Sequence, residues 1–418
     1  MGDAFLKRQL VNVALAANAT RPLPGPPVAV PSFFAGWLTA ELAPHLLALT
    51  TLDTAQHVAR RGLRNPGTLA GVLAAAGYAS LITRGHSAKT EVETALTNAL
   101  GADYHSVLER APLPADLATP WRSLVNPFAM ADVDVVATRR LPYADGGRRF
   151  ELDVYHHRDM PAGAPVLLQI HGGAWMIGEK EQQGIPLMMR MAARGWVCVA
   201  INYPLSPKAK WPDHLVAVKR AIAWIREHGA EYGADPAFLA VTGGSAGGHL
   251  AAMAALTAAD KTLQPGFESA DTTVQACVPH YGVYDFTAED GTRASKIRLR
   301  SVVKRYVMPP DARYPEDYRA ASPLSRVTAD APPFFVIHGV NDTLVPVRDA
   351  RAFVQALREV SQQPVAYAEI AGAQHAFDIF PSVRSAHVVR GVERFLDWTY
   401  SRARLSRAEA RGDAPQPA

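Results

Sequence analysis

The sequence predicts an α/β fold with a mostly parallel central sheet flanked by helices, preceded by a helical N-terminal extension. From about residue 126, short apolar segments alternate with amphipathic helical stretches, which is the pattern of strands joined by crossover helices. The preceding residues lack this alternation and are typical of helices separated by proline-rich linkers. We therefore divide the chain into a helical region at 1–125, an α/β domain at 126–403 and a loose tail at 404–418.

The composition excludes several classes of function. The 418 residues carry a formal net charge of +4 without any basic run that interleaves aromatic side chains, so we expect no nucleic-acid partner. Cys198 and Cys277 are the only cysteines, and both stand in apolar segments, where cysteine usually acts as a small buried hydrophobic residue. Two such cysteines form neither a disulfide framework nor a metal site, so we expect no bound metal.

The N-terminal region contains two apolar segments, 32–52 and 68–83, behind a proline-rich stretch at 21–31 that we expect to be an extended spacer. These segments could form a helical hairpin packed on the α/β domain as a cap, or a hairpin embedded in a membrane. Eight Leu and Phe residues in 32–52 favour insertion by about 4 kcal/mol, whereas the central Glu41 opposes it by about 3 kcal/mol. As a helix, 68–83 spans only about 24 Å of a hydrocarbon core of about 30 Å. The balance favours the packed hairpin and leaves membrane association through 32–83 open.

A further helical stretch at 89–110 and a proline-rich linker at 111–120 lead into the α/β domain. Its predicted strands are short apolar segments at 132–137, 150–155, 165–170, 197–202, 238–242, 276–280, 334–338 and 365–370. Asp145-Gly146-Gly147 predicts a hairpin turn between the first two strands. Apolar residues at helical spacing predict helices over 215–225 and 350–360.

Ser245 lies in the pattern G-x-S-x-G, at Gly243–Gly247, between the predicted strand 238–242 and an apolar helix at 250–256. Strand, tight turn and helix form the context in which this pattern indicates a nucleophile elbow. The helix N-terminus would direct free N–H groups and its positive dipole end at the serine oxygen. We therefore predict that Ser245 is a nucleophile.

A serine hydroxyl needs a base that removes its proton and an acid that orients the base. Asp342 follows the strand 334–338, and His375 follows the strand 365–370, so both stand at the carboxyl edge of the sheet. The order Ser, Asp, His is the order that such folds use. His338 ends a strand and is better interpreted as a structural donor, and Asp285 is the rival acid. We predict that Ser245, Asp342 and His375 form a catalytic triad.

The tetrahedral intermediate of acyl transfer needs hydrogen-bond donors aimed at its oxyanion. His171-Gly172-Gly173 directly follows the strand 165–170, and two glycines allow two backbone N–H groups to face one point. We expect the N–H groups of Gly172, Gly173 and Ala246 to form the oxyanion hole.

Together these motifs resemble the hormone-sensitive-lipase-like branch of the α/β-hydrolases, family IV, which contains many bacterial carboxylesterases and lipases. The resemblance covers about residues 126–400, and its motifs are His171-Gly172-Gly173, Gly243–Gly247, Gly-Val-Asn-Asp ending at Asp342 and Gln-His-Ala-Phe around His375. Tyr203–Pro207 is also similar to the Tyr-x-Leu-Ala-Pro stretch of that group. The resemblance implies an α/β-hydrolase fold with a helical cap and a covalent acyl-enzyme, formed without a metal or organic cofactor.

The chain departs from the pattern of that family. Ala174 takes the fourth position of His-Gly-Gly-Gly and is followed by Trp175, Gly244 stands where an acidic residue usually precedes the nucleophile, and Lys208 stands where a Glu often occurs. The stretch His-Gly-Gly-Ala-Trp is also similar to the His-Gly-Gly-x-Trp of kynurenine formamidases, which keeps an amide-cleaving activity open. We assign Trp175 and Tyr203 to the substrate pocket.

We predict a serine carboxylesterase or lipase that acts on a small-molecule or lipid ester. The alternatives are an arylformamidase, an acyltransferase and a non-catalytic binding module on a hydrolase scaffold. The sequence does not define the acyl chain length, the oligomeric state, or whether the protein works in the cytoplasm or at a membrane or cell envelope.

Overall fold

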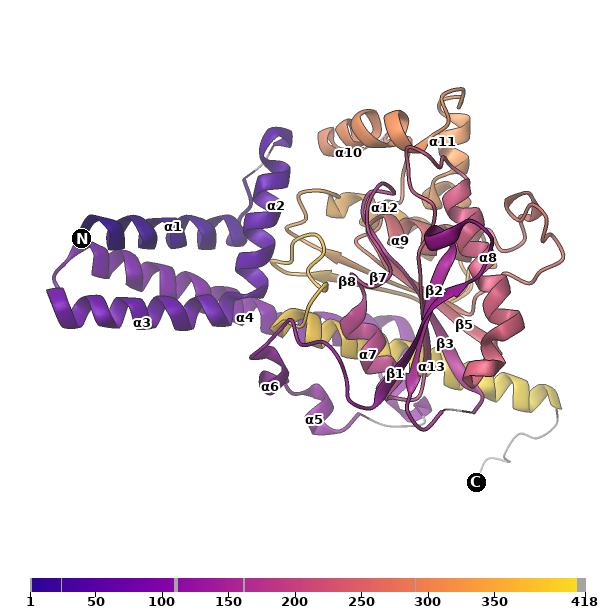
Figure 1. The fold of residues 1–418 in the computed structure, drawn as a ribbon, viewed down its shortest axis with the longest axis horizontal. Helices are drawn as coiled ribbons and strands as arrows, with labels where there is room; N and C mark the ends of the chain where they lie inside the picture. The colour runs from indigo at the N-terminus through magenta and orange to yellow at the C-terminus, as the bar shows by residue number, and fades with distance from the viewer. Residues whose placement is uncertain (1, 24, 109–111, 161, 290, 412–418) are drawn as a thin grey trace.

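The fold is built around one mixed β-sheet (Figure 1). The computed structural model describes residues 2–23, 25–108, 112–160, 162–289 and 291–411, and its sheet has eight strands in the order β1-β2-β4-β3-β5-β6-β7-β8. β2 is antiparallel to β1 and β4, and every other neighbouring pair is parallel. The strands are β1 (Val135–Pro142), β2 (Glu151–His157), β3 (Ala164–Ile170), β4 (Val197–Ile201), β5 (Ala234–Gly244), β6 (Ala276–His280), β7 (Phe334–Gly339) and β8 (Val365–Ile370). The predicted fold class is confirmed.

Helices cover both faces of the sheet, because each central strand buries its side chains on both sides. Val166, Leu168 and Ile170 of β3 belong to the core under α8, α9 and α12, whereas Leu167 belongs to the core under α7, α13 and the end of α4. The helices of this domain are α7 (Ile185–Ala193), α8 (Asp213–His228), α9 (Ala246–Leu256), α10 (Arg293–Arg298), α11 (Glu316–Ala320), α12 (Val347–Val360) and α13 (Val383–Arg411). Short 3-10 helices lie at Gly147–Phe150, Gly229–Tyr232, Lys261–Leu263 and Pro323–Arg326, and a π-helix continues α10 at Leu299–Val307.

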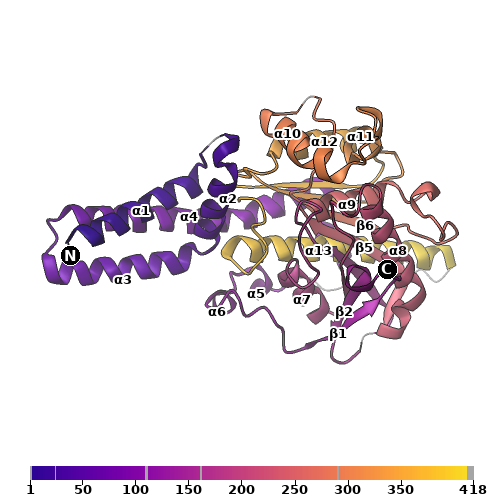
Figure 2. The same cartoon turned by 45° about the horizontal axis from the view of Figure 1, so that its top comes forward.

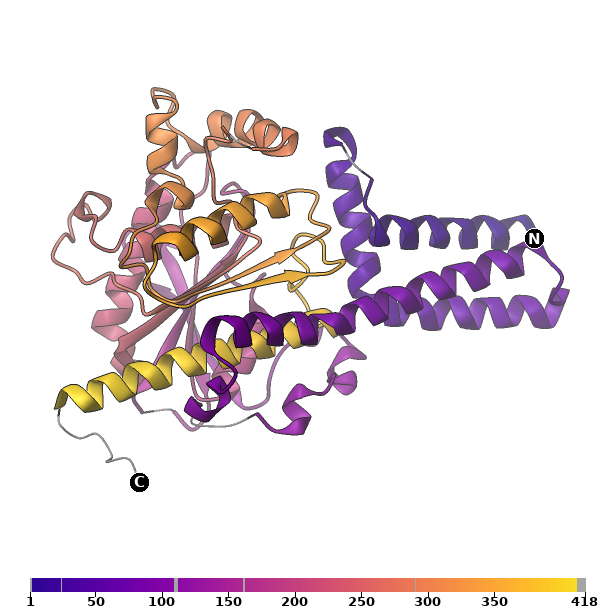
Figure 3. The same cartoon turned by 180° about the vertical axis from the view of Figure 1, so that it is seen from behind.

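The N-terminal helices form an arm that projects from the α/β domain (Figures 1 and 2). α1 (Gly2–Thr20), α3 (Ala43–Arg61) and the first half of α4 (Pro66–Leu100) pack as a three-helix bundle, and α2 (Pro26–Glu41) crosses its base. The second half of α4 leaves the bundle and runs beside α13 behind the sheet (Figure 3). The chain then passes through a 3-10 helix (Tyr104–Val107), α5 (Pro114–Leu117) and α6 (Trp121–Leu124) into β1.

A buried ion pair fixes the base of the arm to the α/β domain. Glu41 at the end of α2 pairs with Arg384 in the first turn of α13, and both side chains are 1% exposed. Ser382 Oγ donates a second hydrogen bond to Glu41 at 2.6 Å. In the loop after β7, Asn341 Nδ2 donates to the carbonyl oxygens of Ala19 and Thr20 at 3.1 and 3.2 Å. The arm is therefore joined to the same sheet edge that carries the predicted acid and base.

The structure corrects three expectations about the helical parts of the chain. The predicted spacer at 21–31 is helical from Pro26, because a proline in the first turn needs no N–H partner. The stretches 68–83 and 89–110 are not separate helices, since α4 runs through both up to Leu100. The predicted tail is helical up to Arg411, where Arg407 holds it by an ion pair to Asp235 at 2.8 Å; residues 412–418 lie outside the described residues.

Candidate active site

Ser245 sits at a sharp turn between β5 and α9. Its backbone has φ 59° and ψ −119°, a conformation that is costly for a residue with a side chain and is found at functional sites. Its N–H donates to the carbonyl oxygen of His280 at 2.9 Å, which fixes the turn to β6. A Cβ atom on Gly243 would lie 2.5 Å from the carbonyl oxygen of Ile170, and one on Gly247 would overlap the same oxygen. The two glycines therefore let this turn approach β3.

Asp342 and His375 come together in the loops that follow β7 and β8. His375 Nδ1 lies 2.6 Å from Asp342 Oδ2, and Asp342 Oδ1 accepts from the N–H groups of Leu344 and Val345 at 2.8 Å. Burial alone would raise the pKa of the Asp342 carboxyl, but the neighbouring His375 and His338 rings outweigh burial and hold it well below its usual range. Asp342 is thus a buried carboxylate whose partners stabilise its charge.

The rival residues have other partners. His338 Nε2 lies 2.9 Å from the carbonyl oxygen of Val345 and 3.4 Å from Asp342 Oδ2. His338 therefore has a structural role: it holds the loop that carries Asp342, which we call the acid loop. Asp285 accepts from the backbone and hydroxyl of Thr287 at 2.7 Å and caps its own loop. Neither residue has a hydrogen bond to His375 in the part of the chain that the structure describes.

Tyr281 links the serine turn to the histidine loop. Its ring centroid lies 4.7 Å from that of His375, and its hydroxyl lies 2.6 Å from the position that a Cβ atom on Gly244 would take. Tyr281 donates to Asp378, and Asp378 Oδ2 lies 2.7 Å from His280 Nδ1. Burial would raise the pKa of Asp378, but His280 and Tyr281 lower it. This network packs against the turn that carries Ser245, and no sequence motif indicates it.

The loop after β3, which carries Gly172 and Gly173 and is called the oxyanion loop below, differs from the prediction in one hydrogen-bond donor. The N–H of Gly172 donates to Gln183 Oε1 at 2.7 Å, so it is not available to a substrate. Among the described residues, the N–H groups of Gly173 and Ala174 have no acceptor, and both residues have a positive φ, 117° and 54°. A side chain on Gly173 would overlap the backbone of Ile177, which explains the glycine. The sequence gives no signal for Gln183, and only the departure from the family pattern marks Ala174.

The predicted pocket residues Trp175 and Tyr203 do not line an open pocket. Trp175 is 1% exposed, and its Nε1 donates to His249 Nδ1 at 3.3 Å. Tyr203 is fully buried, stacks on His171 at 4.3 Å and donates to the carbonyl oxygen of that residue at 3.0 Å. Burial lowers the pKa of His171 to about 4, so this ring is neutral. Both aromatic residues therefore brace the oxyanion loop from inside the protein.

Aromatic side chains of α2 lie beside the predicted base instead. The Phe33 ring meets the His375 ring edge to face at 6.0 Å, and Trp37 stacks on Phe33 at 5.7 Å. Phe34 on α2 and Phe128 beyond α6 are exposed by 52% and 67%. The sequence does contain a signal for this contact, the aromatic cluster of Phe33, Phe34 and Trp37. Composition alone describes these residues only as part of the apolar segment 32–52.

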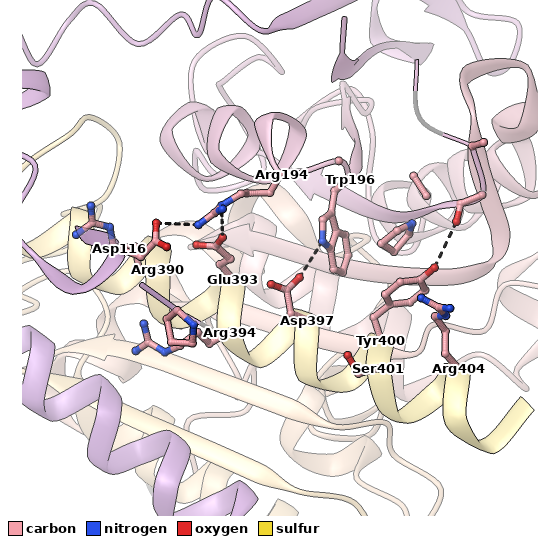
Figure 4. A pocket seen from close by; sticks show the side chains of 16 residues that line it. Asp116, Arg194, Trp196, Arg390, Glu393, Arg394, Asp397, Tyr400, Ser401 and Arg404 are labelled. Atoms are coloured by element: carbon pink, nitrogen blue, oxygen red, sulfur yellow. Dashed lines mark hydrogen bonds and ion pairs between the residues drawn. The ribbon is translucent and has the colours of Figure 1, made fainter. Parts of the chain in front are cut away.

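A small cavity and a larger one lie at opposite ends of the sheet strands. One of about 20 Å³ lies behind the serine turn beside Gln183, Gly243 and Tyr281 and has room for about one water molecule. Another of about 380 Å³ lies at the opposite sheet edge, between the start of β3 and α13 (Figure 4). There Arg194 pairs with Asp116 at 2.7 Å and with Glu393 at 3.0 Å. No group of three or more His, Cys, Asp or Glu side chains in the described ranges could hold a metal ion, and both cysteines are free and buried.

The mostly parallel sheet, the strand–serine–helix turn and the hydrogen-bonded His375–Asp342 pair are the features of the α/β-hydrolase class of enzymes. A family model described as BD-FAE matches residues 152–357.

Similar proteins define the family within that class. The chain is 44% identical over 425 residues to the probable carboxylic ester hydrolase LipM of Mycobacterium tuberculosis, covering 98% of this chain and 94% of LipM. It is 42% identical over 388 residues to the esterase LipQ of the same organism, covering 91% of this chain and 87% of LipQ. A solved truncated form of a carbohydrate esterase from gut microbiota shares the fold, with a TM-score of 0.53 at 22% identity over 63% of this chain and 98% of that one. The chain therefore belongs to the esterase family of LipM and LipQ, in the hormone-sensitive-lipase-like branch, and is a carboxylic ester hydrolase.

Proposed function

We propose that the protein hydrolyses carboxylic esters through Ser245, His375 and Asp342 and a covalent acyl-enzyme. The observation that carries the proposal is the 2.6 Å contact between His375 Nδ1 and Asp342 Oδ2, with Asp342 held by two backbone N–H groups. This arrangement leaves Nε2 of His375, which has no hydrogen-bond partner among the described residues, to accept a proton from Ser245.

In the acylation step, the Ser245 oxygen attacks the ester carbonyl carbon while His375 Nε2 takes the hydroxyl proton. Asp342 accepts the Nδ1–H hydrogen bond, keeps the productive tautomer and stabilises the imidazolium that forms. The strained backbone of Ser245 holds its side chain out from the end of β5.

The negative charge that develops on the carbonyl oxygen needs fixed donors. We assign this role to the N–H groups of Gly173, Ala174 and Ala246. The last belongs to the first turn of α9, whose dipole also favours a negative charge at this end. Each such donor contributes about 3 kcal/mol to the stability of the transition state. Gln183 supports the loop by occupying the N–H of Gly172.

The imidazolium then gives its proton to the leaving alcohol, and the ester bond breaks to give the acyl-enzyme. Water enters, loses a proton to His375 and attacks the acyl carbon, which releases the acid and restores Ser245. The residues named here complete the cycle without a metal or organic cofactor.

The aromatic side chains of α2 indicate that the substrate carries an apolar group. Phe33, Phe34 and Trp37 form a wall next to the base, so an acyl chain or an apolar alcohol would pack against them. We infer that the substrates are esters with a large apolar acyl chain or a large apolar alcohol, including lipid esters.

The alternative activities gain no support from the site. The formamidase hypothesis depended on Trp175, and this side chain is buried against His249 and Phe286 rather than facing a substrate. No observation favours an acyl acceptor other than water, or a scaffold without catalysis.

The test is hydrolysis of a short p-nitrophenyl ester by the wild type and by Ser245→Ala. We expect the variant to retain less than about a thousandth of the wild-type kcat. A folded variant with more activity would exclude Ser245 as the sole nucleophile. N-formylkynurenine as a second substrate separates an amide-cleaving enzyme, which would show the higher kcat/KM on it.

A further inference from the structure

The arm exposes large aliphatic side chains on all three helices of its bundle. We call these residues the apolar belt, and their exposed fractions are 54 to 65%: Leu10 and Val11 on α1, Leu49 and Leu52 on α3, and Leu69, Val72 and Leu73 on α4. The bundle projects away from the α/β domain in all three views, so the domain does not cover the belt (Figures 1–3). Large aliphatic side chains that are this exposed and gathered on one part of a molecule mark an interaction site.

The interior of the same bundle combines a small, alanine-rich apolar cluster with buried polar side chains. Gln9 is fully buried and donates to Asp53 at 2.7 Å, and Asn12 donates to Gln9 at 3.0 Å. Gly71 of α4 lies so close to α3 that a Cβ atom would overlap Thr54. Buried polar side chains in the bundle and large exposed aliphatic side chains on it depart from the usual pattern of a bundle in water. Small residues and interhelical hydrogen bonds are instead what holds helices together in lipid.

Basic residues lie at both ends of the belt. Arg60, Arg61 and Arg64 are exposed at the far tip, and Arg21 and Arg84 are exposed at the base. Asp53 follows the belt residue Leu52 on α3, and Arg8 pairs with its carboxylate at 2.8 and 2.9 Å.

The length of the belt matches a bilayer. Residues 66–83 of α4 carry no charge, and as 18 residues of helix they span about 27 Å, against about 30 Å for the hydrocarbon core. Among the described residues, α4 is the one helix that is long and apolar enough to cross a membrane, and most of its apolar window is not buried.

We propose that the arm inserts into a lipid bilayer with anionic headgroups. The apolar belt contacts the acyl chains, and the arginines at its two ends contact headgroup phosphates. A second copy of this chain is the competing occupant, but a dimer covers one face of each partner. The belt instead comes from the outer sides of three helices, so a solvent that surrounds the bundle fits it better.

The anchoring of the arm gives this insertion a consequence for the reaction, which rests on the proposed function. α1 ends against the acid loop through Asn341, and α2 holds Phe33 against His375. An inserted arm therefore brings the aromatic wall of the site to the membrane side of the domain. Ester lipids would reach Ser245 from the bilayer rather than from solution.

The experiment is flotation of the full-length protein with vesicles of phosphatidylcholine alone or mixed with phosphatidylglycerol. We expect the wild type to float with the mixed vesicles and to bind vesicles of phosphatidylcholine alone at least about tenfold more weakly. The belt variant is the triple substitution Leu69→Ser, Val72→Ser and Leu73→Ser, which changes only exposed side chains. It should lose at least about tenfold in vesicle binding. The matched control is Val133→Ser, Val136→Ser and Val360→Ser, at exposed apolar positions outside the arm, and it should float like the wild type.

Two readouts keep the interpretation unambiguous. Hydrolysis of a soluble short-chain ester by the belt variant should equal that of the wild type, which shows that the variant folds. Ser245→Ala should float like the wild type, so a failure of the proposed reaction does not affect the binding result. A wild type that stays in the soluble fraction, or a belt variant that floats as well as the wild type, would overturn the proposal. So would a wild-type dimer in solution that the belt substitutions dissociate and that does not bind vesicles.

Discussion

Replacing Asp342 by Asn is expected to abolish most of the activity while the fold persists. In the wild type, Oδ1 accepts from the N–H groups of Leu344 and Val345, and Oδ2 faces His375 Nδ1 at 2.6 Å. An Asn side chain must keep its carbonyl oxygen on the two N–H groups, because those are donors. Its NH2 group then points at His375 and donates to Nδ1. The ring adopts the other tautomer and carries its proton on Nε2, where it cannot accept the proton of Ser245.

The loss of the productive tautomer lowers kcat by about 10⁴ in triads of this kind, or about 5.5 kcal/mol of activation free energy. The assay is steady-state hydrolysis of a p-nitrophenyl ester, with urea unfolding to establish that the variant is folded. Asp349→Asn is the matched control, because Asp349 is also buried and pairs with Arg298 at 2.6 Å, and among the described residues its side chain has no hydrogen bond to Ser245 or His375. We expect it to lose stability and keep kcat. A folded Asp342→Asn variant within about tenfold of the wild-type kcat would refute this assignment of the acid.

Three further predictions test the anchoring, the wall and the pH response. Glu41→Gln leaves the Arg384 guanidinium, which is 1% exposed, without its buried partner, so urea unfolding should show a loss of about 3–5 kcal/mol; a loss below about 1 kcal/mol would contradict the role of the pair. Phe33→Ala should lower kcat/KM about tenfold for a long-chain ester and much less for an acetyl ester, and an equal effect on both would exclude Phe33 from the chain-binding wall. Burial lowers the pKa of His171 and His214 to about 4, whereas the pKa in the unfolded chain is about 6.5. The free energy of unfolding therefore keeps its full value above pH 6.5 and falls as the pH drops toward 4, because the unfolded chain binds protons that the folded chain does not. Each ring contributes a slope of up to about 1.4 kcal/mol per pH unit, and unfolding free energies that stay flat between pH 7 and 4.5 would count against it.

The sheet and the chemistry at its carboxyl edge were predictable because their signals are local. Strands buried on both faces are continuous apolar segments, and the glycines around Ser245 are required by the close approach of β3. Chain order placed Asp342 and His375 in loops at one sheet edge, and the structure joins them at 2.6 Å.

The failures concern side-chain direction and long-range partners. Trp175 has φ 61°, and Ala174 before it has φ 54°, so the loop turns the indole into the core, which neighbouring residue types do not indicate. From the sequence, the charge of Glu41 opposes membrane insertion, but in the structure Glu41 pairs with Arg384, which is 343 residues away in the chain. The N–H of Gly172 is likewise occupied by the side chain of Gln183, which no motif includes.

The central claim is that Ser245 carries the acyl group during turnover, and covalent trapping tests it most directly. The wild type would be treated with an organophosphonate ester that has a p-nitrophenol leaving group, and mass spectrometry would locate the adduct after digestion. We predict one phosphonyl group per chain, on the peptide that contains Ser245, with the loss of activity proportional to labelling. Full inactivation with the label on another residue, or an unlabelled Ser245 in an inactivated enzyme, would contradict the account.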